Sequence, residues 1–135
     1  MKRLLQPVGI LSLLLISSQS SAVGLGELKV LSTLNQALHA EVEILEAGNL
    51  SAEEIVISIA SHNTFAKYQI DRPLIYDEIT VEPVAAVESK TTHYRLQSHS
   101  FIHEPFLHLI VEARWPGGRV LREYTALLDL PAPIP

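Results

Sequence analysis

The sequence predicts an all-β protein, an antiparallel β-sandwich of about seven strands with one short helical segment. Apolar residues recur at every second position in several short runs, which is the spacing of strands with one buried face. Turns containing polar residues, Gly or Pro separate these runs. The two longest runs flank the sequence Trp-Pro-Gly-Gly at 115–118, which is typical of a hairpin turn.

The first two strands are expected between Leu28 and Ile44. An alternating run extends from Leu28 to Ser32, and in a second run Val42 and Ile44 alternate with glutamates. Residues 33–39 are predicted to connect these runs, either as a loop or as a kink within one long edge strand.

Residues 51–60 carry two conflicting signals. Ser51 and Glu54 have the spacing of a helix capping box. The residues that follow, Ile55–Ala60, are rich in β-branched side chains, which lose rotamers in a helix and suit a pleated sheet. We therefore expect a strand over Ile55–Ala60, preceded by a turn over Ser51–Glu54.

The helical segment is predicted within residues 61–70. Ser61 or Asn63 can cap its first turn, and Phe65 and Tyr68 lie three residues apart on one face. The helix can hold barely two turns, because an Arg-Pro pair follows and the residue before proline disfavours helical backbone.

Two further strands are predicted from alternation at 76–84 and 93–99, joined by a polar turn at 87–92. The last two strands form the hairpin around the Trp-Pro-Gly-Gly turn. In the strand before the turn every second residue is apolar, from Leu107 to Trp115. Ile110 interrupts the polar opposite face, so this strand is expected to be covered on both sides for part of its length.

This order of elements predicts an immunoglobulin-like sandwich. The Cys…Trp…Cys spacing of antibody domains is absent, because the chain contains no cysteine. The expectation therefore concerns the broad architecture, and the domain must be held together by its hydrophobic core alone.

The two ends of the chain are expected to lie outside this domain. Two cations followed by an apolar run and a small polar stretch predict a signal peptide over residues 1–22. The apolar run is too short to span a bilayer core of about 30 Å. We expect a folded domain over 23–130, a Pro-rich linker or tail beginning at 131–135, and a periplasmic location.

Charge restricts the class of partner. The whole chain has a net charge of −5, and removing Lys2 and Arg3 with the signal peptide leaves −7. Such a domain is a poor ligand for nucleic acid or anionic lipid, and no direct membrane insertion is expected after cleavage. The oligomeric state is not predicted.

No catalytic pattern is recognisable, and we expect neither an enzyme nor a cofactor. There is no Gly-x-Ser-x-Gly elbow and no cysteine nucleophile. His99, His103 and Glu104 are the best metal-ligand candidates, but the two histidines would lie about 13 Å apart on an extended strand. Solvated histidines are therefore favoured over a metal site, and a periplasmic metal-binding protein stays an alternative.

The hairpin is the candidate binding surface. The proposed partner-binding residues combine large contact area with directional donors; they are Arg114, Trp115, Arg119, Arg122 and Tyr124. The structural alternative is that Trp115 ends the row of core residues and that the arginines pair with Glu112, Glu123 and Asp129. A second functional alternative is a small carbohydrate-binding module, such as one for peptidoglycan, in which Trp115 and Tyr124 stack on sugar rings.

Three stretches of the chain carry a family resemblance. They are GLGELKVLSTLNQALHAEVEIL, IVISIASHNTFAKYQIDRP and EPFLHLIVEARWPGGRVLREYTALLD. Together they resemble the N-terminal periplasmic domain of the FimV/TspA-like proteins. The resemblance implies a non-enzymatic interaction domain that supports type IV pilus and secretin assembly, twitching motility and polar organisation. It also implies envelope or pilus-assembly proteins as partners.

Other features of the family are not carried over to these residues. Its members combine this domain with a peptidoglycan-binding LysM module, one transmembrane helix and a long acidic cytoplasmic part. The present sequence contains none of these, so peptidoglycan binding is not transferred. Ala37 stands where a Pro is expected and Gln69 where a small residue is common, and both changes are expected to be tolerated in loops.

Overall fold

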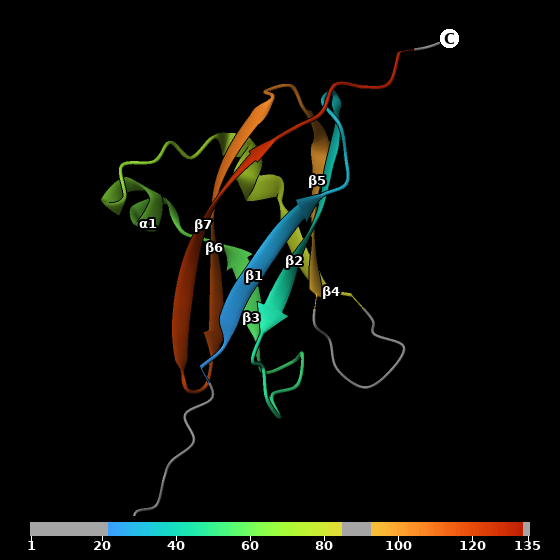
Figure 1. Ribbon diagram of the computed structural model, residues 1–135. Coiled ribbons are helices and arrows are strands. Elements are labelled where there is room, and N and C mark those ends of the chain that lie inside the picture. The colour runs from blue at the N-terminus through green and yellow to red at the C-terminus, as the bar shows by residue number, and fades with distance from the viewer. Residues whose placement is uncertain (1–21, 85–92, 134–135) are drawn as a thin grey trace, which may run out of the picture.

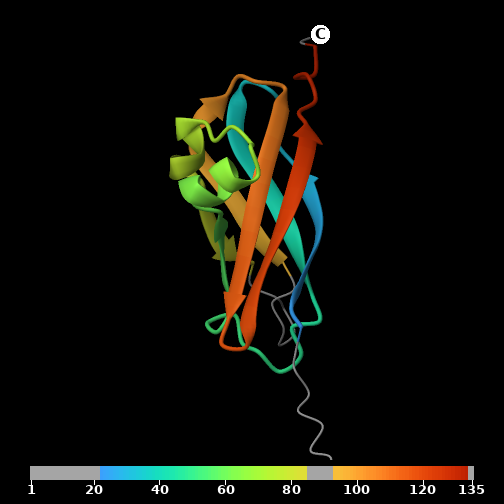
Figure 2. The same cartoon turned by 90° about the vertical axis from the view of Figure 1, so that its left-hand side faces the viewer.

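The computed structural model describes residues 22–84 and 93–133, which form two antiparallel sheets packed face to face (Figures 1 and 2). One sheet has the strand order β1-β2-β5-β4 and the other has the order β3-β6-β7. The strands are β1 (Gly24–Val30), β2 (Gln36–Leu45), β3 (Val56–Ile59), β4 (Thr80–Pro83), β5 (His93–Ile102), β6 (Phe106–Trp115) and β7 (Gly118–Leu127). The helices are α1 (His62–Lys67) and the 3₁₀ helix η1 (Leu74–Glu78).

The predicted fold class is confirmed: the described residues form a sandwich of seven antiparallel strands with one short α-helix. The predicted signal peptide, apart from Ala22, and the predicted turn at 87–92 lie outside the described residues. Within the described part of the chain, no helix combines the length and the apolar character needed to cross a membrane.

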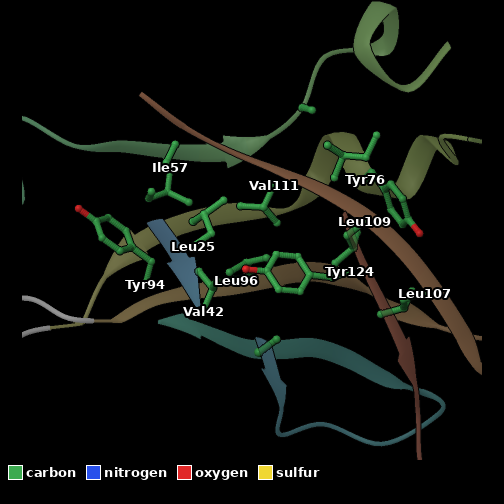
Figure 3. Packing of buried hydrophobic residues seen from close by; sticks show 14 of the residues in the cluster. Leu25, Val42, Ile57, Tyr76, Tyr94, Leu96, Leu107, Leu109, Val111 and Tyr124 are labelled. Atoms are coloured by element: carbon green, nitrogen blue, oxygen red, sulfur yellow. The ribbon is translucent and has the colours of Figure 1, made fainter. Parts of the chain in front are cut away.

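The core lies between the two sheets (Figure 3). Val42 and Leu96 project into it from one sheet, and Leu109 and Val111 project from the other. All four side chains are at most 1% exposed. Their burial removes apolar surface from water, which is the dominant favourable contribution to folding in a chain without disulfides.

The first two strands differ from the prediction in their bounds. Strand β1 begins at Gly24, four residues before the alternating run, and β2 begins at Gln36, inside the segment expected to be a connection. The connection is therefore 31–35. Leu38 and Ala40 continue the buried row of β2; the alanines at 37 and 40 are weak strand formers, so the sequence gives little indication of this extension.

A bulge interrupts the pairing of β2 with β5. The register shifts between Ala37 and His39, and the backbone N–H of Leu38 donates instead to the hydroxyl oxygen of Ser98 at 2.8 Å. That hydroxyl in turn donates to the carbonyl of Ser100 at 2.7 Å. The buried serine thus satisfies a backbone donor that the ladder leaves unpaired.

Replacing Ser98 with alanine is therefore expected to lower the free energy of unfolding by about 1–3 kcal/mol, because it leaves a buried backbone donor without a partner. Urea denaturation of the purified domain measures this change. Ser100→Ala is the matched control, because the Ser100 side chain is exposed and only its carbonyl takes part in the contact. Equal stability of the Ser98 variant and the wild type would contradict this assignment.

The conflicting signals at residues 51–60 are resolved as predicted. Strand β3 covers Val56–Ile59. The capping-box contact forms within the turn before this strand: the backbone N–H of Ser51 donates to the Glu54 carboxylate at 2.8 Å. Helix α1 follows, and of the two predicted caps Ser61 is the one used, since its hydroxyl accepts from Thr64 N–H at 3.3 Å.

The strand predicted over 76–84 begins before the observed strand does. Strand β4 covers only Thr80–Pro83, and the chain before it forms η1. The backbone N–H of Tyr76 donates to the carbonyl of Pro73 at 3.0 Å, which is the i→i+3 bond of a 3₁₀ turn. Proline at the start of this turn fixes the backbone angle that the turn needs, and alternation alone does not reveal it.

Strand β6 is covered on both sides, as predicted. Its inward row includes Leu109, and on the opposite face Ile110 and Glu112 are only 2% and 3% exposed. Tyr68, at the end of α1, lines a hollow together with Ile110 and Leu121. Figure 2 shows α1 beside β6, near the end of the sandwich from which the C-terminus leaves.

Candidate functional site at the hairpin of β6 and β7

Pro116 and Gly117 form the turn of the hairpin, and Trp115 is paired with Gly118 across it. Neither glycine has a positive φ, so the turn does not need them for backbone freedom. The indole of Trp115 folds over the turn instead. A Cβ at Gly117 would lie 3.0 Å from the indole Nε1, and one at Gly118 would lie 3.1 Å from Cζ2. The glycines therefore make room for the tryptophan ring.

Trp115 is half-buried and packs against the edge of the core. Its indole nitrogen is buried and has no hydrogen-bond partner in the described part of the chain. The expectation that Trp115 ends the core-facing row agrees with this position. The ring presents only part of its surface to solvent, and it lies on the face of β6 opposite to Arg114.

Arg114 and Arg119, named here the arginine pair, face each other across the hairpin in register. Both guanidinium groups approach the same carboxylate, that of Glu112. Arg114 Nε donates to Glu112 Oε1, and Arg119 Nε lies 3.4 Å from the same oxygen. Two like charges opposite each other are unfavourable in a sheet, and the shared carboxylate offsets this repulsion.

The arginine pair keeps one uncompensated positive charge. Its side chains are 65% and 48% exposed, whereas the side chain of Glu112 is 4% exposed. Within the described residues, both arginines contact Glu112 through Nε, and their terminal nitrogens donate no hydrogen bond there. Those nitrogens can therefore donate to a carboxylate or phosphate of another molecule.

Arg122 and Tyr124 occupy a different position from the arginine pair. A terminal nitrogen of Arg122 donates to the carbonyls of Leu25 at 2.6 Å and Gly26 at 2.9 Å. The hydroxyl of Tyr124 donates to the Gly26 carbonyl at 2.6 Å. These carbonyls lie where β1 bulges away from β2, between Leu25 and Leu28. The two side chains thus tie β7 to the opposite sheet.

Tyr124 belongs to the core. It is 7% exposed, and the Arg122 guanidinium carbon lies 5.0 Å from the centre of its ring. Burial raises the pKa of the Tyr124 hydroxyl, and the neighbouring Arg122 opposes this shift. Of the five residues predicted for partner binding, the structure therefore places three at the turn: Arg114 and Arg119 on one face of the hairpin, and Trp115 on the core-facing side.

Pairing across the hairpin agrees only in part with the structural alternative. Glu112 accepts from the arginines as expected, whereas Glu123 pairs with His108. The described contact of Asp129 is made by its carbonyl, which accepts from Leu34 N–H at 2.8 Å. The sequence pattern did not identify Glu112 as the buried anchor, although its neighbour Ile110 signalled a covered face.

Of the two histidines considered as metal ligands, His103 hydrogen-bonds through its ring to the side chain of Asn35 at 3.0 Å. Residues 22–84 and 93–133 contain no group of three His, Cys, Asp or Glu side chains arranged to hold a metal ion.

Comparison with known proteins supplies the family. A family model described as the FimV N-terminal Ig-like domain matches residues 23–131. The motility hub protein FimV of Pseudomonas aeruginosa, from strain PAO1 and from strain UCBPP-PA14, is 40% identical over 117 residues. These residues are 87% of the chain but only 13% of either relative. No solved structure matches the chain significantly. Since the family model covers both sheets and the hairpin, the chain belongs to the FimV N-terminal Ig-like domain family.

Proposed function

We propose that the chain is a non-enzymatic periplasmic interaction domain that supports type IV pilus assembly and surface motility through protein contacts. Membership of the FimV N-terminal family supports this role, as does a relative named as a motility hub protein. The predicted signal peptide, which except for Ala22 lies outside the described residues, supports export to the periplasm.

The arginine pair is the observation that carries the proposal of a contact surface. Two exposed guanidinium groups are held side by side by one buried carboxylate, so little side-chain entropy remains to be lost when a partner binds. Arginine and tryptophan are enriched at the centres of interfaces. The partner contributes a carboxylate to this surface. It is an envelope or pilus-assembly protein, with the secretin as the candidate that the family resemblance suggests.

The geometry favours this role over carbohydrate binding. A sugar ring stacks on an exposed aromatic face, and the carbohydrate hypothesis relied on Trp115 and Tyr124. Tyr124 is buried and bonded to β1. Part of the Trp115 ring is covered by the glycines of the turn. The two rings therefore do not form a stacking platform.

The expected result of removing the arginine pair is a loss of twitching and of secretin multimers in the bacterium that carries this chain. The variant is Arg114→Gln/Arg119→Gln with Glu112→Gln, because the third change avoids leaving a buried carboxylate unpaired. Twitching zones and immunoblots of secretin multimers measure the effect. Glu112→Gln alone keeps both cations but removes the carboxylate that holds them, so it is expected to cause a smaller loss than the triple change.

Lys67→Gln is the matched control, because it removes one cation from the exposed end of α1. Circular dichroism of the purified variants checks that each one folds. A folded triple variant with normal twitching and normal secretin multimers would refute the proposed contact surface. Deleting the whole locus separately tests the proposed motility role, since unchanged twitching in the deletion strain would refute that role altogether.

A further inference from the structure

A groove lies at the end of the sandwich opposite the hairpin turn. Strand β6 runs from Phe106, at the groove, to Trp115, at the turn, so the two surfaces are about 30 Å apart. The groove consists of two adjoining hollows with volumes of about 290 and 190 Å³. Pro73, Tyr76 and Glu104 line both of them. We call this pair of hollows the end groove; its lining comes from η1 with the residues before it and from the connection between β5 and β6 with its flanks.

Two exposed aromatic rings form the apolar part of the end groove. Phe106 lines the larger hollow and is 49% exposed, and Phe101 lines the smaller hollow and is 59% exposed. Tyr76 is 4% exposed beneath them, and its hydroxyl accepts from the N–H of His108 at 3.2 Å. Large apolar side chains exposed beside a concave surface are typical of a binding site.

Two carboxylates give the end groove its charge. Asp71 lines the larger hollow, and Glu104 lines both hollows. The Glu104 charge also acts on the hydroxyl of Tyr76: burial is the main cause that raises the pKa of this tyrosine, and Glu104 adds to it. Among the described residues, neither carboxylate has an ion-pair partner.

Arg72 and the two histidines beside the end groove bond to groups other than its carboxylates; the ring of His103, in the smaller hollow, bonds to the side chain of Asn35. Arg72 donates to the carbonyl of Ala60 at 3.0 Å and pairs with Asp77. His108 pairs with Glu123 on β7. The groove therefore combines an apolar surface with negative charge that the described part of the domain leaves uncompensated.

We propose that the end groove binds an extended segment of a partner protein in which a lysine or arginine stands next to an apolar side chain. The apolar side chain enters the smaller hollow beside Phe101. The neighbouring cation lies between Asp71 and Glu104 and against the ring of Phe106, where carboxylates and an aromatic face both favour it. The net charge of −7 outside the signal peptide attracts such a segment over a longer range. This surface is separate from the arginine pair and does not depend on it.

The test uses a defined probe, the peptide acetyl-Leu-Lys-Leu-Lys-Gly-amide, titrated into the ¹⁵N-labelled domain. Amide shifts are expected at 69–76 and 101–108, and the hairpin turn is expected to stay unchanged. The same peptide with glutamate in place of lysine is expected to cause no shifts. Because the attraction is between exposed charges, added salt is expected to weaken binding.

Two carboxylate substitutions test the role of charge. Asp71→Asn combined with Glu104→Gln is expected to weaken peptide binding by roughly tenfold or more, since two charge-assisted contacts are lost. Glu53→Gln removes a carboxylate from the turn before β3 and is the matched control, with no expected change in affinity. Both variants keep the shape of the side chain, and urea denaturation checks their stability.

Three results would overturn the proposal. The first is peptide shifts that map outside the end groove, and the second is unchanged affinity in the folded double variant. The third is concentration-dependent dimerisation in sedimentation velocity that Arg119→Gln abolishes. That result would assign the end groove to the hairpin of a second copy of the chain. Motility is not a readout of these experiments, so their outcome is independent of the role proposed for the arginine pair.

Discussion

Replacing Phe65 with alanine is expected to lower the free energy of unfolding by about 3–5 kcal/mol. Phe65 is 1% exposed and is among the largest fully buried side chains of the domain. Its ring centre lies 6.0 Å from that of Tyr76, and the Arg72 guanidinium carbon lies 5.5 Å from it. Truncation would leave a cavity that these neighbours fill only in part.

The effect of this substitution should be concentrated in the segment from α1 to η1. A helix of six residues is not stable by itself, so α1 depends on its buried aromatic side chain. Amide hydrogen exchange is expected to speed up most at 61–78. Peptide binding in the end groove should weaken as well, because Tyr76 forms part of its wall.

Tyr68→Ala is the matched control for Phe65→Ala. Tyr68 follows the last helical residue of α1 and is 52% exposed, so its loss is expected to change the free energy of unfolding far less. Urea denaturation of both variants gives the comparison. Equal losses in the two variants would show that Phe65 does not anchor the segment.

The parts of the fold that the sequence predicted best are those with a long alternating row. The hairpin of β6 and β7 is the main example, because every second residue from Leu107 to Trp115 is apolar and a short turn fixes the register of its two ten-residue strands. The helix was predicted from its cap and its stop signal. Both signals are local, and local backbone preferences are what a single sequence expresses most directly.

The remaining elements depend on contacts that are distant in sequence. Strand β2 starts at Gln36 because its buried residues continue the row of Val42 and because Ser98, sixty residues away, completes its hydrogen bonding. The 3₁₀ helix η1 forms where the chain crosses from one sheet to the other, and Tyr76 anchors it in the core. Neither contact leaves a periodic signal in the sequence.

The candidate site shows the same division between local and distant information. Residue parity placed Arg114 and Trp115 on opposite faces of β6, and the structure agrees. Odd or even position along the strand does not predict that Arg122 and Tyr124 have a different role from the arginine pair. Their partners are backbone carbonyls on β1, almost a hundred residues away. The end groove was not predicted at all, since its lining comes from two segments, 69–76 and 101–108, that are distant in the sequence.

Raising the pH above about 10 is expected to unfold the domain through its buried tyrosines. Burial is the main cause that raises the pKa of Tyr76, Tyr94 and Tyr124 above their usual value. In Figure 3 the hydroxyls of Tyr94 and Tyr76 point away from the centre of the core, toward opposite ends. Tyr94 donates to the carbonyls of Ala52 and Ile55, and Tyr124 donates to that of Gly26. Ionisation would remove each of these donated protons.

The direction of the effect follows from proton binding in the two states. Below the pKa of an unfolded tyrosine, both states keep the phenolic proton and the contribution to stability is complete. Above that pKa the unfolded chain releases the proton while the folded chain retains it, so stability falls as the pH rises through the folded pKa. The slope of this decline is set by the number of protons released on unfolding, and each buried tyrosine contributes at most one of them.

The measurement is a pair of alkaline titrations, one of tyrosinate absorbance and one of circular dichroism. The tyrosinate signal of the three buried residues is expected to rise together with loss of the β-sheet signal. Tyr124→Phe should make the loss of stability with pH less steep by removing one of the linked groups, although it also removes the bond to Gly26. Tyr68→Phe, at an exposed site, is the matched control and should leave the unfolding transition in place. Ionisation of all the tyrosines while the sheet signal persists would contradict the proposed burial of their hydroxyls, and with it the contact between Tyr124 and the bulge of β1.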